Sequence, residues 1–310
     1  MTKLQKALYT HWISRLGRAK VNELADGMDV GKSVFEKSRE IVNSTSEANL
    51  KSLVLEGFTG FFHQTAYLRR TNAGVVNNNI DAVKKITEEG AVSHSTVLVK
   101  LVVEGHASLR ALLTVTEAME FLPLGQGAPV SFDIPFPVCV NIAGQNISVH
   151  TLTMQSTMET WAEIVSANLR RMLSVVRADS HYDHAVDFLR AAGVDVGDYV
   201  DCSSEAIKLM KRAGVHTYSG TLEVGTVGSS KHSALRGKGK KPLRESMADE
   251  FSKLVSAKRV VTAEVEIAED HLGIKAGSKL ALYPSIGKIA FRSNLEGCNP
   301  DEFVLAMAKI

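Results

Sequence analysis

The sequence lacks the features that mark most secreted, metal-binding and membrane proteins. Its 310 residues include only three cysteines, Cys139, Cys202 and Cys298, which are far apart and form no CxxC pair. This pattern is typical of reduced thiols and argues against a disulfide framework or a zinc ribbon. No apolar run approaches the ~20 residues that span a bilayer, and the N-terminus has no apolar signal core. We therefore expect a cytoplasmic protein without membrane contact.

Signatures of catalysis and of cofactor binding are also missing. Gly31-Lys32-Ser33 resembles the end of a phosphate-binding loop, but Asp26 stands where that loop needs a glycine. His181, His184 and Asp187 have helical spacing, yet no further ligand pair accompanies them, and zinc sites need three or four ligands. No GxSxG motif frames a nucleophilic serine. We therefore expect a protein that is not an enzyme and that holds neither a metal nor a cofactor.

The whole chain has almost balanced charge, but individual segments carry an excess of one sign. The net charge is only +2, whereas residues 231–244 carry +6 and residues 1–20 carry +5 without any acidic residue. The rest of the chain is therefore at −9, and part of this lies in 179–205, where seven acidic residues face one arginine. Such asymmetry indicates a polyanionic partner or a complementary protein surface.

The basic segments are the main candidates for binding phosphates. A glycine-rich, basic segment near 228–242 is expected to be flexible and to follow a phosphate backbone without reading bases. Arg69 and Arg70 follow a stretch that is rich in aromatic residues. The candidate phosphate-binding residues are Lys231, Arg236, Lys238, Lys240, Lys241, Arg244, Arg69, Arg70, Lys3, Lys6, Arg15, Arg18 and Lys20. A solvated loop that only keeps the protein soluble is the alternative reading of residues 231–244.

The aromatic stretch itself can be read in two ways. Phe61, Phe62 and Tyr67 are close in sequence to the arginines, and aromatic rings next to arginines are typical of single-strand binding surfaces. Such rings at helical spacing more often belong to the hydrophobic core. The sequence leaves both readings open.

The periodicity of apolar residues predicts an α+β fold. Residues 1–90 read mainly as helices, and 130–140 alternate between apolar and polar residues as a strand with one buried face. Pro135 and Pro137 lack N–H donors, which predicts that this strand lies at a sheet edge. Antiparallel hairpins are expected at about 130–152 and 260–292, packed against long helices. The longest of these helices is predicted at about 154–177.

Three regions are expected along the chain, either as separate domains or as parts of one. They are a mainly helical region at 1–90, a region of hairpin and long helices at 91–213, and a β-rich region with the basic loop at 214–310. Further helices are expected near 182–192, 204–213, 243–258 and 301–309.

Together these observations favour a non-enzymatic protein that binds nucleic acid with little sequence preference, most of all single-stranded DNA. Such a protein acts in replication or as a transcription cofactor, and a homo-oligomer and a polymerase are expected partners. The general profile also suits a viral protein encoded by a bacteriophage and acting in the host cytoplasm. The alternative is a virion or other assembly protein with a basic arm, because an edge strand and a charged arm also build subunit contacts. An enzyme of a family without a visible motif is the third hypothesis.

Overall fold

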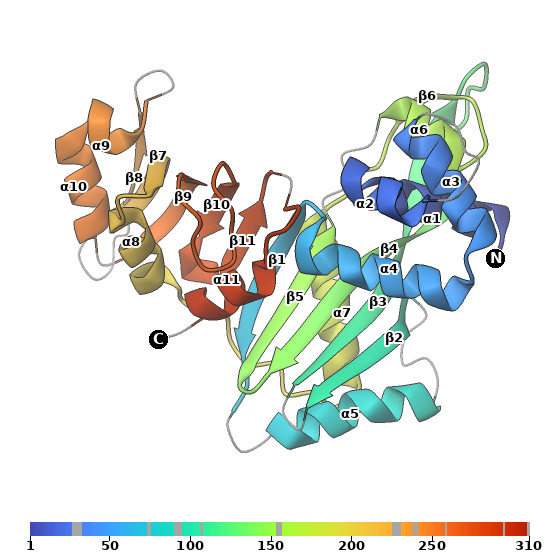
Figure 1. Ribbon diagram of the computed structural model, residues 1–310, viewed down its shortest axis with the longest axis horizontal. Coiled ribbons are helices and arrows are strands. Elements are labelled where there is room, and N and C mark those ends of the chain that lie inside the picture. Colours follow the sequence, from blue (N-terminus) through green and yellow to red (C-terminus); the bar gives the residue numbers. More distant parts are fainter. Residues whose placement is uncertain are drawn as a thin grey trace.

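The computed structural model of this chain is a mixed α+β structure around one antiparallel sheet (Figure 1). It describes residues 1–26, 33–72, 76–89, 95–105, 108–152, 157–224, 231–237, 241–257, 259–293 and 295–308. Eleven strands lie in these ranges: β1 (Gln64–Arg70), β2 (Thr96–Gly105), β3 (Ser108–Pro123), β4 (Val130–Ala143), β5 (Asn146–Leu152), β6 (Leu169–Met172), β7 (Val215–Val224), β8 (Lys231–Arg236), β9 (Val260–Ile267), β10 (Lys279–Tyr283) and β11 (Lys288–Phe291).

The sheet joins distant parts of the chain. Its order is β2-β3-β4-β5-β1-β11-β10-β9-β7-β8, and β6 pairs with β3 outside this path. Strand β1 pairs with β5 on one side and with β11 on the other. The sheet therefore runs through all three regions that the sequence suggested.

Helices lie on both faces of the sheet and at its two ends (Figure 1). They are α1 (Lys3–Ser14), α2 (Arg18–Leu24), α3 (Val34–Ser44), α4 (Glu47–Gly60), α5 (Val76–Glu89), α6 (Met158–Ile164), α7 (Ala178–Ala191), α8 (Ser203–Lys211), α9 (Leu243–Ser246), α10 (Ala248–Ser256) and α11 (Pro300–Met307), with a 3-10 turn, η2, at Pro284–Ile286. Several begin at a side-chain cap: Thr2 and Ser33 each form a capping box, with Gln5 and Glu36.

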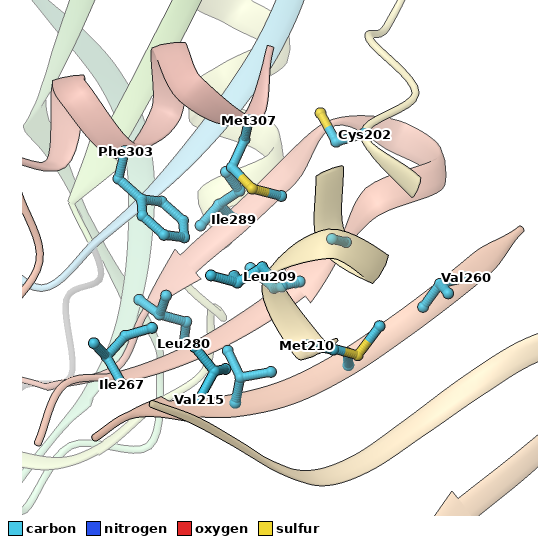
Figure 2. Packing of buried hydrophobic residues seen from close by; sticks show 14 of the residues in the cluster. Cys202, Leu209, Met210, Val215, Val260, Ile267, Leu280, Ile289, Phe303 and Met307 are labelled. Atoms are coloured by element: carbon cyan, nitrogen blue, oxygen red, sulfur yellow. The ribbon is translucent and has the colours of Figure 1, made fainter. Parts of the chain in front are cut away.

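Three apolar clusters form the core. The N-terminal helices and α6 pack on one face of β3 and β4, and α5 and α7 cover the other face of these strands and of β5. A third cluster joins α8, α10 and α11 to β7 and β9–β11. Figure 2 shows Phe303 and Met307 of α11 pointing toward the sheet near Ile289 and Leu280.

Both predicted hairpin regions are confirmed as antiparallel. Strands β4 and β5 pair around Gly144, whose φ of 58° suits a tight turn. Strands β9, β10 and β11 are consecutive antiparallel neighbours. The helices expected near 182–192, 204–213 and 301–309 correspond to α7, α8 and α11.

The predicted edge position of the 130–140 strand is correct only for its first part. From Val138 on, β4 lies between β3 and β5, whereas 130–137 pairs with β3 alone among the described strands. The prolines fit there for a local reason. The pairing of β4 with β5 begins at Val138, whereas Pro135 and Pro137 are paired with β3 at Thr116 and Thr114. The missing N–H groups therefore fall outside the ladder between β4 and β5.

The predicted long helix at 154–177 is also wrong, because among its described residues only Met158–Ile164 is helical and Leu169–Met172 forms β6. The helix expected at 243–258 is divided into α9 and α10 at Met247. The segment near 228–242 was predicted to be flexible, but it contains β8, and every residue of β8 pairs with β7. The longest helices in the described ranges have 14 residues.

Candidate nucleic-acid interface

One face of the C-terminal half of the sheet is polar, opposite the face on which the apolar cluster of α8, α10 and α11 packs. Strand register places Ser219, Glu264, Ala281, Ala290 and Thr65 in one row across five strands. The neighbouring row contains Tyr283, Lys288 and Tyr67. We call this surface the polar face; its charged and aromatic members are Arg236, Tyr218, Glu264, Glu266, Lys279, Tyr283, Lys288 and Arg292.

A cavity of about 610 Å³ lies on the polar face between β7, β9 and β10. Its polar lining side chains are Tyr218, Glu264, Glu266, Lys279 and Arg292. A register shift between Thr217 and Ser219 marks a β-bulge at Tyr218, and such bulges re-aim side chains. The Tyr218 hydroxyl donates a 3.3 Å hydrogen bond to Glu266 Oε2. Partial burial and Glu266 both raise the pKa of Tyr218.

Ion pairs on the polar face are weak. Arg292 Nη1 is 2.8 Å from Glu264 Oε1, and Lys279 Nζ is 3.9 Å from Glu266 Oε2. Arg292 and Glu264 are each about half exposed, and exposed pairs of this kind contribute only ~0–1 kcal/mol. An incoming phosphate can therefore take either cation from its carboxylate at low cost.

Lysine and tyrosine side chains alternate toward the centre of the sheet. Lys288 Nζ lies 5.2 Å from the centroid of the Tyr67 ring and 5.3 Å from that of Tyr283, within the range of cation–π attraction. Asp179 accepts hydrogen bonds from Lys288 Nζ at 2.6 Å and from the Tyr67 hydroxyl. Partial burial acts to raise the pKa of Asp179, but these two donors hold it below its usual range.

A second cation is held between rings one row further on. The Arg69 guanidinium carbon is 3.5 Å from the centroid of the Tyr199 ring and 5.6 Å from that of Tyr182. Arg69 Nε donates to the Tyr182 hydroxyl, and Nη1 donates to the Gly197 carbonyl at 3.0 Å. Tyr182 in turn stacks on Tyr67 with centroids 4.2 Å apart. The rings and cations thus form one connected group.

Residues of the C-terminal basic cluster have different environments. Lys231 begins β8, and Arg236 and Lys241 are exposed, whereas Lys238 and Lys240 lie outside the described residues. The prediction that Arg244 grips phosphate from a mobile arm is not supported by its contacts. Its Nη2 donates to the carbonyls of Met210, Lys211 and Arg212 at the end of α8, and the guanidinium stacks on Phe251.

Only some of the N-terminal basic residues are exposed and so accessible to a phosphate. Lys3, Lys6 and Arg18 are exposed. Lys20 instead forms ion pairs with Glu23 at 3.0 Å and with Glu56 at 3.1 Å. Arg15 is half-buried and donates a 3.2 Å hydrogen bond from Nε to His11 Nε2.

The aromatic stretch belongs to the core, which corrects the prediction of base stacking for its members. Phe62 is fully buried and packs edge-on against Phe58, with ring centroids 5.3 Å apart. Tyr67 is buried beneath Lys288 and Tyr182, and burial together with Asp179 raises its pKa far above the usual value. Phe61 is half-buried against the N-terminal cluster. Arg70, beside Arg69, donates to the Ala308 carbonyl at 2.9 Å and so holds the end of α11.

The histidine group on α7 is divided between core and surface. His181 is buried, stacks on Phe136 at 4.3 Å, and has Nε2 at 3.3 Å from Glu117 Oε2. His184 and Asp187 are exposed. Among the described residues, no group of three or more His, Cys, Asp or Glu side chains is placed to hold a metal. No helix in those same ranges is both long and apolar enough to cross a membrane.

The chain matches no family model, no curated relative and no solved structure in comparisons with known proteins. The function must therefore be argued from the geometry alone.

Sequence reasoning missed most residues of the polar face. Lys288, Ala290 and Arg292 have the period of two that places them on one strand face, so this part could have been found from the hairpin at 280–291. Tyr199 is different, because only an isolated bridge to Arg69 brings it to the sheet. No pattern in the sequence around Tyr199 predicts its contact with Arg69.

Proposed function

We propose that this protein binds single-stranded nucleic acid along the polar face, with little sequence preference and without catalysis. The observation that carries the proposal is that exposed cations and half-buried tyrosine rings share one face of the sheet. Lys279, Arg292 and Arg236 are exposed there. Tyr218 lines the same cavity as Lys279 and Arg292, and Tyr283 lies beside Lys288 further along the face. Cations that follow a phosphate backbone and rings that stack on bases are the two components of single-strand binding.

The site differs from the mobile arm expected from the sequence. Arg236 lies on a strand and is paired with Ser219, which itself donates to Glu264 at 3.0 Å. A rigid sheet positions its cations in advance, so less ordering entropy opposes binding.

The number of cations sets the expected salt dependence. Three phosphate contacts to a single strand predict a slope of about −2 in log K against log salt concentration. The protein should therefore bind weakly at physiological salt and measurably at 50 mM.

The test is a titration of labelled dT oligonucleotides with the full chain, followed by fluorescence anisotropy at 50–200 mM salt. Lys279→Gln combined with Arg292→Gln is expected to lower affinity about tenfold and to bring the slope close to −0.7. The matched control, Lys3→Gln with Lys6→Gln, removes two exposed lysines from α1 and should change neither quantity. Absence of binding, or equal effects of the two double variants, overturns the proposal.

A separate observation favours the assembly hypothesis as the second candidate. Strand β2 is an outer strand of the sheet, and its Val97 and Val103 side chains are 40% and 47% exposed. Exposed apolar edge strands are sites of association. Sedimentation velocity of the wild type and of Val103→Lys distinguishes this candidate, because an assembly built on β2 dissociates in the variant. A monomeric wild type counts against it.

A further inference from the structure

A second cavity, of about 400 Å³, lies where the end of β1 meets the segment that precedes α8. It is lined by Arg70, Thr71, Asn72, Gly197, Asp198, Tyr199, Val200 and Asp201. The Tyr199 side chain is the aromatic wall of this cavity and is 41% exposed. A volume of this size is in the range of small-ligand sites.

The Tyr199 ring is held in place before any ligand arrives. Arg69 lies at 3.5 Å over the ring and is itself fixed by Tyr182 and by the Gly197 carbonyl. The backbone around Tyr199 is fixed by two hydrogen bonds, Arg70 N to Asp198 O at 3.1 Å and Val200 N to Leu68 O at 3.2 Å. An exposed ring that is supported by a guanidinium on one face is a preformed stacking surface.

The other walls accept hydrogen bonds. Asp198 is exposed at the rim, and Asp201 Oδ1 accepts from Ser203 N at 2.9 Å. Arg70 in the lining donates to the Ala308 carbonyl, and Asp201 Oδ2 lies 3.6 Å from Arg259 Nε. Asp198 is therefore the lining group that we assign to the ligand, and an acceptor suits the donors of a base better than it suits a phosphate. A carboxylate offers two acceptor oxygens, which match the adjacent N1–H and amino donors of guanine as a bidentate pair. Thymine presents one donor between two carbonyl oxygens and is a poor match.

Strand register relates Tyr199 to the polar face. Arg69 and Tyr199 are bridge partners, and they stand one row beyond Tyr67 and Lys288 on the same side of the sheet. A strand that crosses the polar face can therefore place one nucleotide at Tyr199.

We infer that this cavity holds an unpaired nucleobase stacked on Tyr199 and that Asp198 favours bases with an amino group, guanine first. The inference rests on the proposed single-strand binding. It adds a preference for one base at one position to a surface that otherwise binds without sequence preference.

The experiment uses the full chain and dT oligonucleotides with one central substitution: guanosine, inosine or an abasic site. Guanosine is expected to raise affinity about tenfold over thymidine, whereas inosine, which lacks the amino group, gains less. The abasic site should bind more weakly than thymidine, because no ring stacks on Tyr199.

Three variants assign the effects to residues. Asp198→Asn should abolish the guanosine preference and should not lower the affinity for plain dT, because it removes a negative charge from the path of a polyanion. Tyr199→Ala should lower affinity for every oligonucleotide about tenfold, whereas Tyr199→Phe, which keeps the ring, should bind as the wild type does. Circular dichroism of each variant confirms that the fold is retained.

The outcomes separate this inference from the proposed function. If plain dT binds in a manner that depends on Lys279 and Arg292, but guanosine has no advantage and Tyr199→Ala binds normally, the base pocket is wrong and the proposed function stands. If a guanosine preference persists in Asp198→Asn, the assignment to Asp198 is wrong. If no oligonucleotide binds, both proposals fail.

Discussion

Arg110 on β3 and Asp301 on α11 are 191 positions apart in the sequence and form a 2.8 Å ion pair between Nη2 and Oδ2. Asn141 Nδ2 donates to the other carboxylate oxygen of Asp301, also at 2.8 Å. Buried His150 has Nε2 at 3.5 Å from that same oxygen. One carboxylate on the C-terminal helix therefore collects side chains from three strands, and this fixes α11 to the centre of the sheet.

We expect Asp301→Ala to lower the free energy of unfolding by about 2–4 kcal/mol, because in a largely buried place it removes the acceptor of Asn141 Nδ2 and the closest acceptor of Arg110. Arg110 keeps its hydrogen bond to Asn141 Oδ1 and its longer contact with Glu104. Urea denaturation measures the loss. Glu302→Ala is the matched control: it removes an exposed carboxylate from the same first helical turn and should cost less than about 1 kcal/mol. Equal losses would show that the network contributes nothing beyond the helix dipole.

Arg244 should be a stabilising residue and not a binding residue. Because its guanidinium satisfies carbonyls at the end of α8 and stacks on Phe251, Arg244→Gln should lower the free energy of unfolding by about 1–2 kcal/mol. The affinity for a dT oligonucleotide and its salt slope should stay as in the wild type. A loss of affinity as large as that of the Lys279 and Arg292 double variant would return Arg244 to the phosphate-binding set.

The sequence could predict those elements whose apolar pattern has only one structural solution. Strict alternation over Val130–Val140 fits a strand alone, and this segment lies in the observed hairpin of β4 and β5. In contrast, the spacing of Trp161, Val165, Leu169 and Met172 fits a long helix, but a short helix followed by a strand buries the same side chains. The choice between them is made by the pairing of β6 with β3, which is a contact between distant segments.

The candidate site was harder to predict for the same reason. Composition identified Arg69 and the basic segment, but Arg69 acquires its role from Tyr182 and Tyr199, which are more than 100 positions away. The glycines around 220–239 suggested flexibility, although backbone pairing with β7 makes β8 a regular strand. The burial of Phe62 and Tyr67 could not be predicted from their spacing, because aromatic residues of a hydrophobic core and of a base-stacking surface can have the same spacing.

Gly287 should tolerate no side chain. It connects η2 to β11 with φ of 58°, and an added Cβ would lie 2.7 Å from the Val200 carbonyl oxygen. Gly144→Ala is an informative control, because Gly144 has the same φ but open space around it. We expect about 1 kcal/mol of destabilisation at Gly144, from the left-handed backbone alone, and at least twice as much at Gly287. Thermal or urea unfolding measures both losses. Equal losses in the two variants would mean that the loop before α8, which contains Val200, moves away from the added Cβ without a loss of stability.

The free energy of unfolding should fall as the pH is lowered, in part because of His11 on α1. Burial, and then the charge of Arg15, lower the pKa of His11 from 6.5 to about 4. Between these values the unfolded chain binds a proton that the folded chain does not, so the free energy of unfolding is fully retained above pH 6.5 and declines as pH falls toward 4.

The decline that His11 contributes is about 3 kcal/mol over that interval, at ~1.4 kcal/mol per pH unit. His11→Gln replaces the imidazole by an amide, which does not titrate but can still accept from Arg15. Urea unfolding at pH 7.0, 5.5 and 4.5 should therefore show a smaller decline in the variant than in the wild type, because carboxylates and His150 titrate in both. Parallel curves would mean that His11 becomes protonated without leaving the folded state, which its burial against Arg15 argues against.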